Sequence, residues 1–585
     1  MFDIFDVLAL IGGLCLFLFG MNVMGDGLER RAGNSLKALL GKLTGNKFTG
    51  FLTGMGVTAV IQSSSATTVM VVGFVNSKLM TLKQSIGVIM GANIGTTITA
   101  WVLSLGGIAS DNVFMKLLKP TSFTPVLALI GIAFTMFSKS SKRKDTGTIL
   151  LGFATLMFGM DAMSDAVSGL ANVPEFRNLF LAFENPILGV LVGAVVTALI
   201  QSSSASVGIL QALSATGAVT YGAAIPIVMG QGIGTCVTAL LSSIGTTKNA
   251  KRAALVHLSF NVIGTVLWLS VFSVLSHVLK PMILNESASH LGIAVCHTGF
   301  KALCALVLLP ASELLEKLAY KLVPEGKTPE KAVELDERLL ATPPIAVEQS
   351  SRLAAKMAAE AVEGFRLSIE SIGNYSSEAI KKIRKIEDDT DHYEDVLGTF
   401  LAKLSKSQMS DEDGAKVTQL LKAIGDFERI SDHAVNVIES IEEMREKGIR
   451  FSPAAKRELD VLCRAVDETL VMTEAAFAGG DLSIAYNVEP LEQVVDGLKD
   501  LLRNNHILRL KEGSCTVETG FIWSDLLTNF ERVSDHCSNI AVGIIDANAN
   551  TMNAHEVINR FKKDNPLFAE KYEEYAKKYS VSQLS

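Results

Sequence analysis

Several signatures of catalysis and secretion are missing from this chain of 585 residues. The apolar N-terminal part contains no GxxxxGK[ST] loop, so it does not power itself with a bound nucleotide. No nucleophile–base motif is present, which argues against an enzyme. The first residues, MFDIFDVLAL, carry neither a basic stretch nor a small-residue cleavage site. We therefore expect them to form a retained first helix rather than a cleaved signal peptide.

Paired cysteines and an even charge distribution are also absent. The seven cysteines form no CxxC pair, and three of them lie in the C-terminal part without disulfide-like spacing. Reduced thiols and a cytoplasmic location of that part are expected. Residues 1–312 carry a net charge of +8, whereas residues 313–585 carry −15. The first part is membrane-like and the second is soluble and acidic, which argues against nucleic-acid binding.

The membrane-like part repeats itself with an offset of 139 residues and no gap. Phe19-Gly20-Met21 matches 158–160, and Ile94-Gly95-Thr96 matches 233–235. Apolar stretches run over about 7–25, 48–75, 84–105, 122–137, 148–168, 186–214, 222–244, 254–280 and 290–311. This pattern predicts a duplicated membrane domain, with repeat 1 at about 1–138, repeat 2 at about 146–280 and an extra helix at 290–311.

A polar tetrad occurs at the same place in each repeat. Four adjacent polar side chains are costly at membrane depth unless they line a cavity or find partners. We interpret both tetrads as tips of re-entrant hairpins that together build one site for an anion and sodium, because hydroxyl and amide groups supply both donors and acceptors. Helix packing through small residues is the alternative. The residues are Gln62, Ser63, Ser64, Ser65 and Gln201, Ser202, Ser203, Ser204.

The segments GANIGTT and GQGIGTC follow the tetrads and suggest helices broken by glycine. Their oxygen-bearing side chains are candidate ligands, with close glycine packing as the alternative. Asp26 and Asp165 match in register and are expected to cap helices near the membrane interface, with ion coupling as the second interpretation. His257 and His297 are expected to serve in packing or at the interface. The candidate ligands are Asn93, Thr96, Thr97, Gln231 and Thr235.

Basic residues cluster in three short loops. The loops span residues 30–47, 139–145 and 247–252, and the positive-inside rule assigns all three to the cytoplasm. The first repeat would then begin outside and the second inside. The two halves are therefore expected to have inverted topology, if each crosses the membrane an odd number of times.

The soluble part begins with a linker at 313–349, Pro-rich over 323–350, and continues as helices over 350–545 and an end segment at 546–585. Its helical region is duplicated, since the motif Phe-Glu-Arg-x-Ser-Asp-His recurs after 103 residues, which predicts two three-helix units in tandem. Pairs of carboxylates at i and i+4 share one helix face, where a metal with oxygen ligands would relieve their repulsion; a solvated acidic face is the alternative. The pairs are Glu387/Asp391, Glu428/Asp432, Glu492/Asp496 and Glu531/Asp535.

The doubled Gln-Ser-Ser-Ser together with Gly-x-x-Ile-Gly-Thr resembles the type II sodium/phosphate cotransporter family over about residues 1–312. The duplicated acidic tail resembles the PhoU regulators of phosphate uptake over about 350–545. The combination looks like the bacterial cotransporters that carry a PhoU-like tail. The resemblance implies coupled transport of inorganic phosphate and sodium, with the tetrads at the binding sites and a divalent metal or iron at the acidic pairs.

We therefore expect an all-α, multi-pass inner-membrane transporter with a cytoplasmic regulatory domain and no enzymatic activity. Its expected partners are phosphate, sodium as coupling ion, the lipid bilayer and a second copy in a homodimer. Two rival functions remain: a phosphate-regulated anion channel, and a receptor that senses phosphate without moving it. Sodium-dependent flux would separate the transporter from both.

Overall fold

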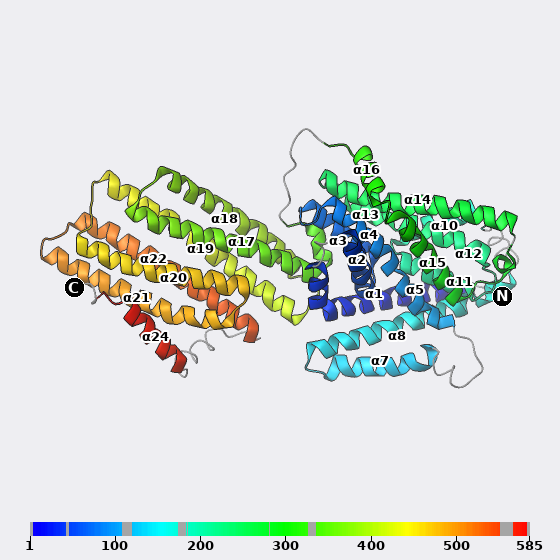
Figure 1. Ribbon diagram of the computed structural model, residues 1–585. Helices are drawn as coiled ribbons and strands as arrows, with labels where there is room; N and C mark the ends of the chain where they lie inside the picture. The colour runs from blue at the N-terminus through cyan, green and yellow to red at the C-terminus, as the bar shows by residue number, and fades with distance from the viewer. Residues whose placement is uncertain are drawn as a thin grey trace. The chain divides into compact units, whose positions relative to one another are not determined.

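Figure 1 shows the computed structural model of the chain, which describes residues 4–41, 46–107, 120–173, 183, 185–279, 281–325, 335–549 and 566–581. Within these ranges the secondary structure is helical, apart from one isolated antiparallel bridge between Thr220 and Ser287. The all-α fold class is confirmed. The chain divides into two compact units, Met1–Ile345 and Ala346–Ser585.

The first unit contains the same series of helices twice. The first series is α1 (Ile4–Gly41), α2 (Lys47–Ile61), α3 (Ser64–Asn76), α4 (Leu82–Gly95), α5 (Thr97–Ser104) and α7 (Pro120–Phe137). The second is α8 (Ser141–Ser168), α10 (Pro186–Ile200), α11 (Ser203–Ser214), α12 (Tyr221–Gly234), α13 (Cys236–Ser242) and α14 (Lys248–Val278). Helices α15 (His290–Leu308) and α16 (Ser312–Leu322) follow. Six described segments of this unit are long and apolar enough to cross a membrane. Parts of both expected repeats, including residues 42–45, 108–119 and 174–182, lie outside the described residues.

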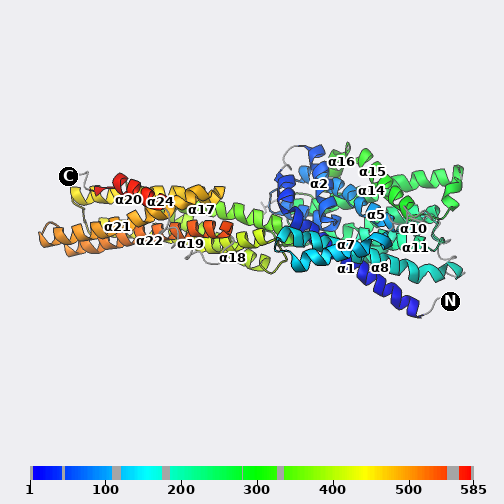
Figure 2. The same cartoon turned by 90° about the horizontal axis from the view of Figure 1, so that it is seen from below.

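Helices α1 and α8 are equivalent in the two repeats, and they pack against each other in opposite directions (Figure 1, Figure 2). A Cβ atom on Gly20 would lie 2.7 Å from the carbonyl oxygen of Gly152, and one on Gly159 would lie 2.7 Å from that of Gly13. The offset of 139 residues converts Gly13 into Gly152 and Gly20 into Gly159. The contact pairs therefore exchange with each other, as a two-fold axis between antiparallel helices requires. This pairing is the arrangement that inverted repeats produce.

Glycines also bring α2 against α4 and α10 against α12. A Cβ atom on Gly91 would lie 1.9 Å from the carbonyl oxygen of Phe51, and one on Gly230 would lie 2.0 Å from that of Val190. Close packing is thus what these glycines provide. Each segment is divided after a glycine, as expected, since α4 ends at Gly95 and α12 ends at Gly234. The division is slight, because Thr96 alone separates α4 from α5 and keeps helical dihedral angles (φ −58°, ψ −28°).

Side-chain contacts connect the described residues of the three basic stretches, which lie largely in helices, since α1 continues to Gly41 and α14 begins at Lys248. Arg30 at the end of the first cluster forms an ion pair with Asp145, which directly follows the second cluster. Helix α16 then connects the first cluster to the third. The connecting contacts are Arg30 Nε to Asp145 Oδ1 at 3.1 Å, Lys47 Nζ to Ser312 Oγ at 3.4 Å and Arg252 Nε to the Val323 carbonyl oxygen at 2.9 Å.

The segment that precedes the second unit is bound to the first. Asp336 is buried, accepts a hydrogen bond from Asn76 Nδ2 at 2.6 Å and pairs with Arg338 at 2.9 Å. Arg338 also donates from Nε to the carbonyl oxygen of Ser242 at 2.5 Å. We call residues 335–341, which include the short helix η4 (Glu337–Ala341), the connector. It joins α3 to the end of α13.

The expected linker at 313–349 is therefore largely structured where it is described. Helix α16 covers Ser312–Leu322, and helix α17 (Pro343–Gly373) already begins at Pro343. The prolines at 343 and 344 suggested a linker, but proline is well tolerated in the first turn of a helix, where its missing N–H is not needed. Residues 326–334 of the expected linker lie outside the described residues.

The second unit consists of two sets of three long helices, consistent with the expected tandem arrangement. The first set is α17, α18 (Ser377–Leu404) and α19 (Asp411–Glu446); the second is α20 (Pro453–Gly479), α21 (Leu482–Lys511) and α22 (Val517–Ala549). The repeated motifs face each other, since the rings of His433 and His536 lie 5.7 Å apart. Helix α24 (Pro566–Lys578) packs on α21. Residues 550–565 and 582–585 of the expected end segment lie outside the described residues.

Candidate functional site

Each Gln-Ser-Ser-Ser tetrad forms the sharp turn between two short helices. Gln62 ends α2 and Gln201 ends α10, both with a φ of 59°, a left-handed conformation that is uncommon for residues other than glycine. The next residue, Ser63 or Ser202, starts the following helix as its N-cap. Helix α2 has 15 residues and spans roughly 22 Å, less than the thickness of a bilayer core. Such short helical hairpins fit the expected re-entrant geometry.

The cap positions leave part of each tetrad available to a ligand. Ser63 Oγ accepts a hydrogen bond from the Ala66 amide at 3.1 Å, and Ser202 Oγ accepts one from the Ala205 amide at 3.2 Å. These bonds occupy an acceptor lone pair, and each hydroxyl keeps its own hydrogen as a donor. Ser65 Oγ donates to the Gln201 carbonyl oxygen at 3.2 Å and so links the two hairpin tips.

Helix α5 holds the first tetrad in place. Thr99 Oγ1 donates to Gln62 Oε1 at 2.9 Å, and Gln62 Nε2 donates to the Ala59 carbonyl oxygen at 2.5 Å. The Gln62 side chain is therefore fixed by two partners. The left-handed turn that presents the serines depends on this support as well as on the backbone.

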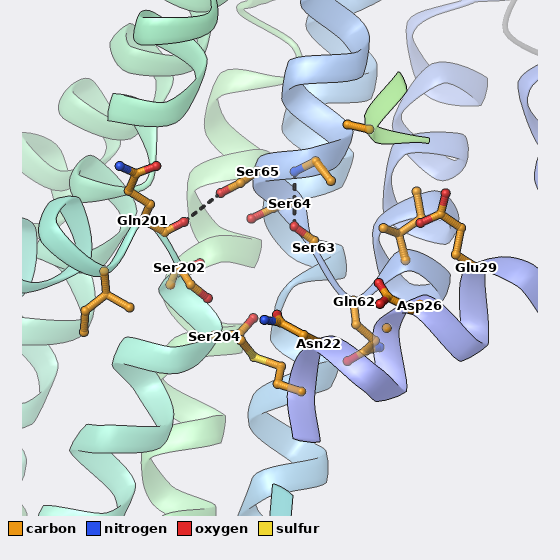
Figure 3. A pocket seen from close by; sticks show the side chains of 17 residues that line it. Asn22, Asp26, Glu29, Gln62, Ser63, Ser64, Ser65, Gln201, Ser202 and Ser204 are labelled. Atoms are coloured by element: carbon orange, nitrogen blue, oxygen red, sulfur yellow. Dashed lines mark hydrogen bonds between the residues drawn. The ribbon is translucent and has the colours of Figure 1, made fainter. Parts of the chain in front are cut away.

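Both tetrads line a single cavity of about 360 Å³ (Figure 3). The structure thus brings together the eight tetrad residues predicted from the sequence. Helix α1 supplies the opposite wall, which includes two carboxylates, and the connector contributes Ala341. No lysine or arginine is among the lining residues, which are Met21, Asn22, Gly25, Asp26, Glu29, Ile61, Gln62, Ser63, Ser64, Ser65, Ala66, Ile200, Gln201, Ser202, Ser203, Ser204 and Ala341.

The cavity combines two kinds of electrostatic environment. Helices α3 and α11 both begin at it, and a helix N-terminus favours an anion through its unpaired N–H groups and its dipole. Asp26 and Glu29 are carboxylates, which favour a cation. Figure 3 shows these two acids near Gln62, on the α1 side of the site. An anion and a cation bound together would satisfy both environments.

Part of this wall was not predicted from the sequence. Asp26 was expected to cap a helix near the interface, but α1 continues to Gly41, and Asp26 lies inside the helix and faces the cavity. Glu29 and Asn22 were not singled out at all. Asn22 precedes Asp26 by four residues and Glu29 follows it by three, so all three lie on one helix face. This spacing was the available signal.

The candidate ligands in the GANIGTT and GQGIGTC segments do not line this cavity. Thr96 Oγ1 donates to the Ala92 carbonyl oxygen at 3.1 Å, and Thr235 Oγ1 donates to that of Gln231 at 2.9 Å. Thr97 Oγ1 likewise donates to the Ile94 carbonyl oxygen at 2.8 Å. These hydroxyl groups serve their own helices. Gln231 is buried, and its Oε1 has no hydrogen-bond partner in the described part of the chain.

Asn93 instead accepts a hydrogen bond from a buried lysine. Lys301 in α15 is 3% exposed, and its Nζ lies 2.9 Å from Asn93 Oδ1 and 3.2 Å from Asn261 Oδ1. His257 and His297 are also buried, and both are close enough to interact electrostatically with Lys301. Residues 290–311 were expected to form an extra apolar helix. One lysine inside an apolar stretch was the signal that could have found this site.

The acidic pairs of the second unit are not gathered into a metal site. The described residues contain no group of three or more His, Cys, Asp or Glu side chains arranged to hold a metal. In the second half, Lys499 Nζ lies 2.9 Å from Glu531 Oε1 and 3.5 Å from Asp496 Oδ1, so an ammonium group already bridges two of the acids. Glu492, the partner of Asp496 in its pair, is buried and accepts a hydrogen bond from Gln493 Nε2 at 2.9 Å.

The first half of the second unit retains a more repulsive arrangement. Burial, together with the nearby carboxylates of Asp388 and Asp432, raises the pKa of Glu387. Burial and the charge of Asp432 also raise the pKa of Glu428. Asp391 contributes to the same effect on Glu387. All four predicted acids of this half therefore interact with at least one other acid of the set.

The fold and the cavity together define a helical membrane protein built from two inverted repeats with one shared polar site. Two family models match the chain: "Na+/Pi-cotransporter" over residues 16–165 and 156–304, and "PhoU domain" over residues 354–441 and 459–543. The chain contains a sodium/phosphate cotransporter domain over residues 16–304 and a duplicated PhoU domain over residues 354–543. Both resemblances expected from the sequence are confirmed.

The chain is also similar to individual proteins along different parts of its length. A Salmonella typhimurium protein named YjbB, whose name assigns it provisionally to inorganic phosphate export, is 24% identical over 92% of this chain and 97% of its own length. Human sodium-dependent phosphate transport protein 2B is 37% identical over 22% of this chain and 19% of its own. The crystal structure of the phosphate transport regulatory protein PhoU from Streptococcus pneumoniae covers 36% of the chain and 98% of its own, with 14% identity and a TM-score of 0.33.

Proposed function

We propose that this protein carries inorganic phosphate across the cell membrane together with sodium, by alternating access of the cavity between the tetrads. The observation that carries the proposal is the composition of that cavity, in which two helix N-termini and up to six serine hydroxyls face two carboxylates. Phosphate is an anion and would be repelled by Asp26 and Glu29 if it bound alone. Sodium bound beside these acids removes the repulsion, so binding of either ion favours binding of the other.

This reciprocity is the physical basis of the proposed coupling. Hydroxyl groups and helix N-termini donate to phosphate oxygens, while carboxylate, hydroxyl and carbonyl oxygens suit sodium. The net direction then follows from the combined gradients of the two ions. Export, as in the name of the Salmonella relative, and uptake are both compatible with the same site.

We further propose an inner-membrane location with the basic loops and the PhoU domain in the cytoplasm. The contacts that connect the three basic stretches, together with the positive-inside rule, support this orientation. Single cysteines introduced at Ser140 and Lys248 should both be labelled from the cytoplasmic side in inverted vesicles. Labelling of Ser140→Cys from outside intact cells would overturn the orientation.

The connector supports a regulatory role for the PhoU domain. Asp336, Arg338 and Leu339 lie against α3, the helix whose N-terminus forms half of the anion site. Ala341 lines the cavity itself, and α17 of the PhoU domain begins two residues later. A change in the PhoU domain that pulls on α17 would therefore act directly on the cavity wall. We expect the domain to change the rate of transport in response to phosphate status.

A cation in the first half of the PhoU domain is part of this proposal, and the acids there would have to move closer together to hold it, since the described residues contain no preformed metal site. The mutual repulsion of Glu387, Glu428 and Asp432 supports binding there, whereas Lys499 already fills the equivalent role in the second half. Oxygen ligands suit a divalent cation or iron. The domain would then use metal in one half and an internal ammonium group in the other.

The test is phosphate flux in vesicles that contain the purified full-length chain, under a sodium gradient imposed in either direction. Coupled transport predicts that reversing the sodium gradient reverses the phosphate flux. A channel would pass phosphate without response to the sodium gradient, and a receptor would pass none. Either result would refute the proposal, and a site built from both repeats favours transport.

A further inference from the structure

Lys301 occupies a position between the two repeats. Its Nζ lies 2.9 Å from Asn93 Oδ1 of repeat 1 and 3.2 Å from Asn261 Oδ1 of repeat 2. Asn93 corresponds to Gly232 under the offset of 139 residues. A Cβ atom on Gly232 would lie 3.1 Å from Lys301 Nζ and 2.8 Å from Asn261 Oδ1. The amide of repeat 1 is thus a ligand of the lysine, and the glycine of repeat 2 leaves the room that the lysine needs.

Both amides are oriented to receive a cation. Asn93 donates its Nδ2 to the Ile89 carbonyl oxygen at 3.0 Å, and Asn261 donates its Nδ2 to the His257 carbonyl oxygen at 3.0 Å. Each side chain therefore uses its NH₂ group on its own helix, that of Asn261 also on Cys236 Sγ at 3.4 Å, and presents its oxygen to Lys301. Two fixed oxygens that face one position form a partial cage for a singly charged cation.

Lys301 has no acidic partner among the described residues. Neither an ion pair nor a hydrogen bond joins it to an aspartate or glutamate there, and its side chain is 3% exposed. A buried ammonium group without a carboxylate is costly, so such groups inside membrane proteins generally mark ion pathways or binding sites. Packing alone would be served better by methionine or leucine.

We propose that the Lys301 ammonium group is a tethered cation that occupies a sodium-type position between the repeats and replaces one coupling ion. This inference rests on the proposed sodium-coupled function. A sodium ion that crosses with phosphate adds the energy of its gradient to transport, whereas an ammonium group fixed to α15 adds none. The chain would therefore couple fewer sodium ions to each phosphate than a transporter with an empty amide site at this place.

The first experiment compares sodium dependence in vesicles. Lys301→Gln removes the ammonium group and leaves an uncharged site that a sodium ion can enter. We expect its phosphate flux to fall at low sodium, to recover at high sodium, and to show a steeper dependence on sodium than the wild type. Lys83→Gln, which removes an exposed lysine of α4, is the matched control and should keep the wild-type dependence. An unchanged sodium dependence of K301Q, or a loss that high sodium does not restore, would overturn the inference.

A second measurement does not depend on transport. Asn93→Asp places a carboxylate against Lys301 Nζ, and a double-mutant cycle with K301Q measures their interaction by thermal unfolding of the purified protein. If Lys301 carries its charge, N93D should destabilise the protein much less with the lysine present than together with K301Q. Equal destabilisation in both backgrounds would show that the lysine carries no charge and would refute the inference.

The two failures remain distinguishable. A wild-type protein that moves no phosphate under any gradient would refute the proposed function. A wild-type protein with sodium-coupled flux, combined with either negative result above, would refute the role of Lys301 alone.

Discussion

Ser63 and Ser64, the first two serines of the first tetrad, should respond differently to mutation. Ser64 lines the cavity and is 6% exposed, and its hydroxyl donates to no other residue in the described part of the chain. Ser63 also lines the cavity, but its Oγ caps α3 through the Ala66 amide. Ser64→Ala should therefore remove a ligand contact without affecting the helix, whereas Ser63→Ala should also weaken the fold.

The magnitudes follow from the types of bond. A hydrogen bond to a charged ligand contributes about 1.5–3 kcal/mol. Since roughly 1.4 kcal/mol corresponds to tenfold in affinity, S64A should raise the phosphate concentration for half-maximal flux roughly tenfold to a hundredfold. Loss of an N-cap costs about 0.5–2 kcal/mol of stability. S63A should therefore lower the thermal midpoint, and S64A should leave it unchanged.

The assay is phosphate flux at saturating sodium in vesicles, with thermal unfolding of the same purified preparations. Ser203→Ala, the equivalent of S64A in repeat 2, should show the same loss of affinity. Ser77→Ala is the matched control, because Ser77 Oγ donates to the Gly73 carbonyl oxygen at the far end of α3, away from the cavity. Wild-type affinity in both S64A and S203A would refute the assignment of the cavity as the phosphate site.

Three further outcomes are expected. Gly91→Val should prevent correct folding, because a Cβ atom at this position would lie 1.9 Å from a carbonyl oxygen of α2. Size-exclusion chromatography should then show a loss of monodisperse protein. Normal folding would contradict the close approach of α2 and α4. Divalent cations should raise the thermal midpoints of the wild type and of Asp535→Ala by similar amounts, and that of Asp432→Ala by less. Equal shifts in all three proteins would refute the proposed metal site in the first half of the PhoU domain. A chain that ends after Thr342 should retain sodium-coupled flux but lose its response to phosphate status. A chain that ends at Pro324 should also change its phosphate affinity, because it lacks the part of the cavity wall that the connector provides. Identical behaviour of the two truncated chains would exclude a role of the connector.

The pH dependence of the PhoU domain follows from the same carboxylates. The pKa values of Glu387 and Glu428 are raised in the folded chain, so these groups bind protons more readily there than in the unfolded chain. Their contribution to stability is complete below the unfolded pKa and is lost as the pH rises through the folded pKa. The domain should therefore be more sensitive to removal of cations at neutral pH than at mildly acidic pH, as thermal unfolding with a chelator would show.

Much of the site could be predicted from the sequence because of its repetition. Serines 63–65 and 202–204 interrupt apolar stretches at matching places, and polar groups at membrane depth need partners wherever the helices run. The prediction of one shared cavity needed no knowledge of packing. The glycines of the GANIGTT segment were harder to interpret, because the same residue permits both a broken helix and a close contact, and the backbone of α2 decides for contact.

The sequence by itself determined the two-part organisation, the duplication and the tetrad site, since these follow from local composition and from register along the chain. Tertiary structure alone decided that Asp26 and Glu29 face the tetrads, that Ala341 closes part of the cavity and that Lys301 meets Asn93. Asn93 and Lys301 are 208 residues apart. Their contact arises from the packing of α15 between the repeats, and no local pattern encodes which helix will fill that space.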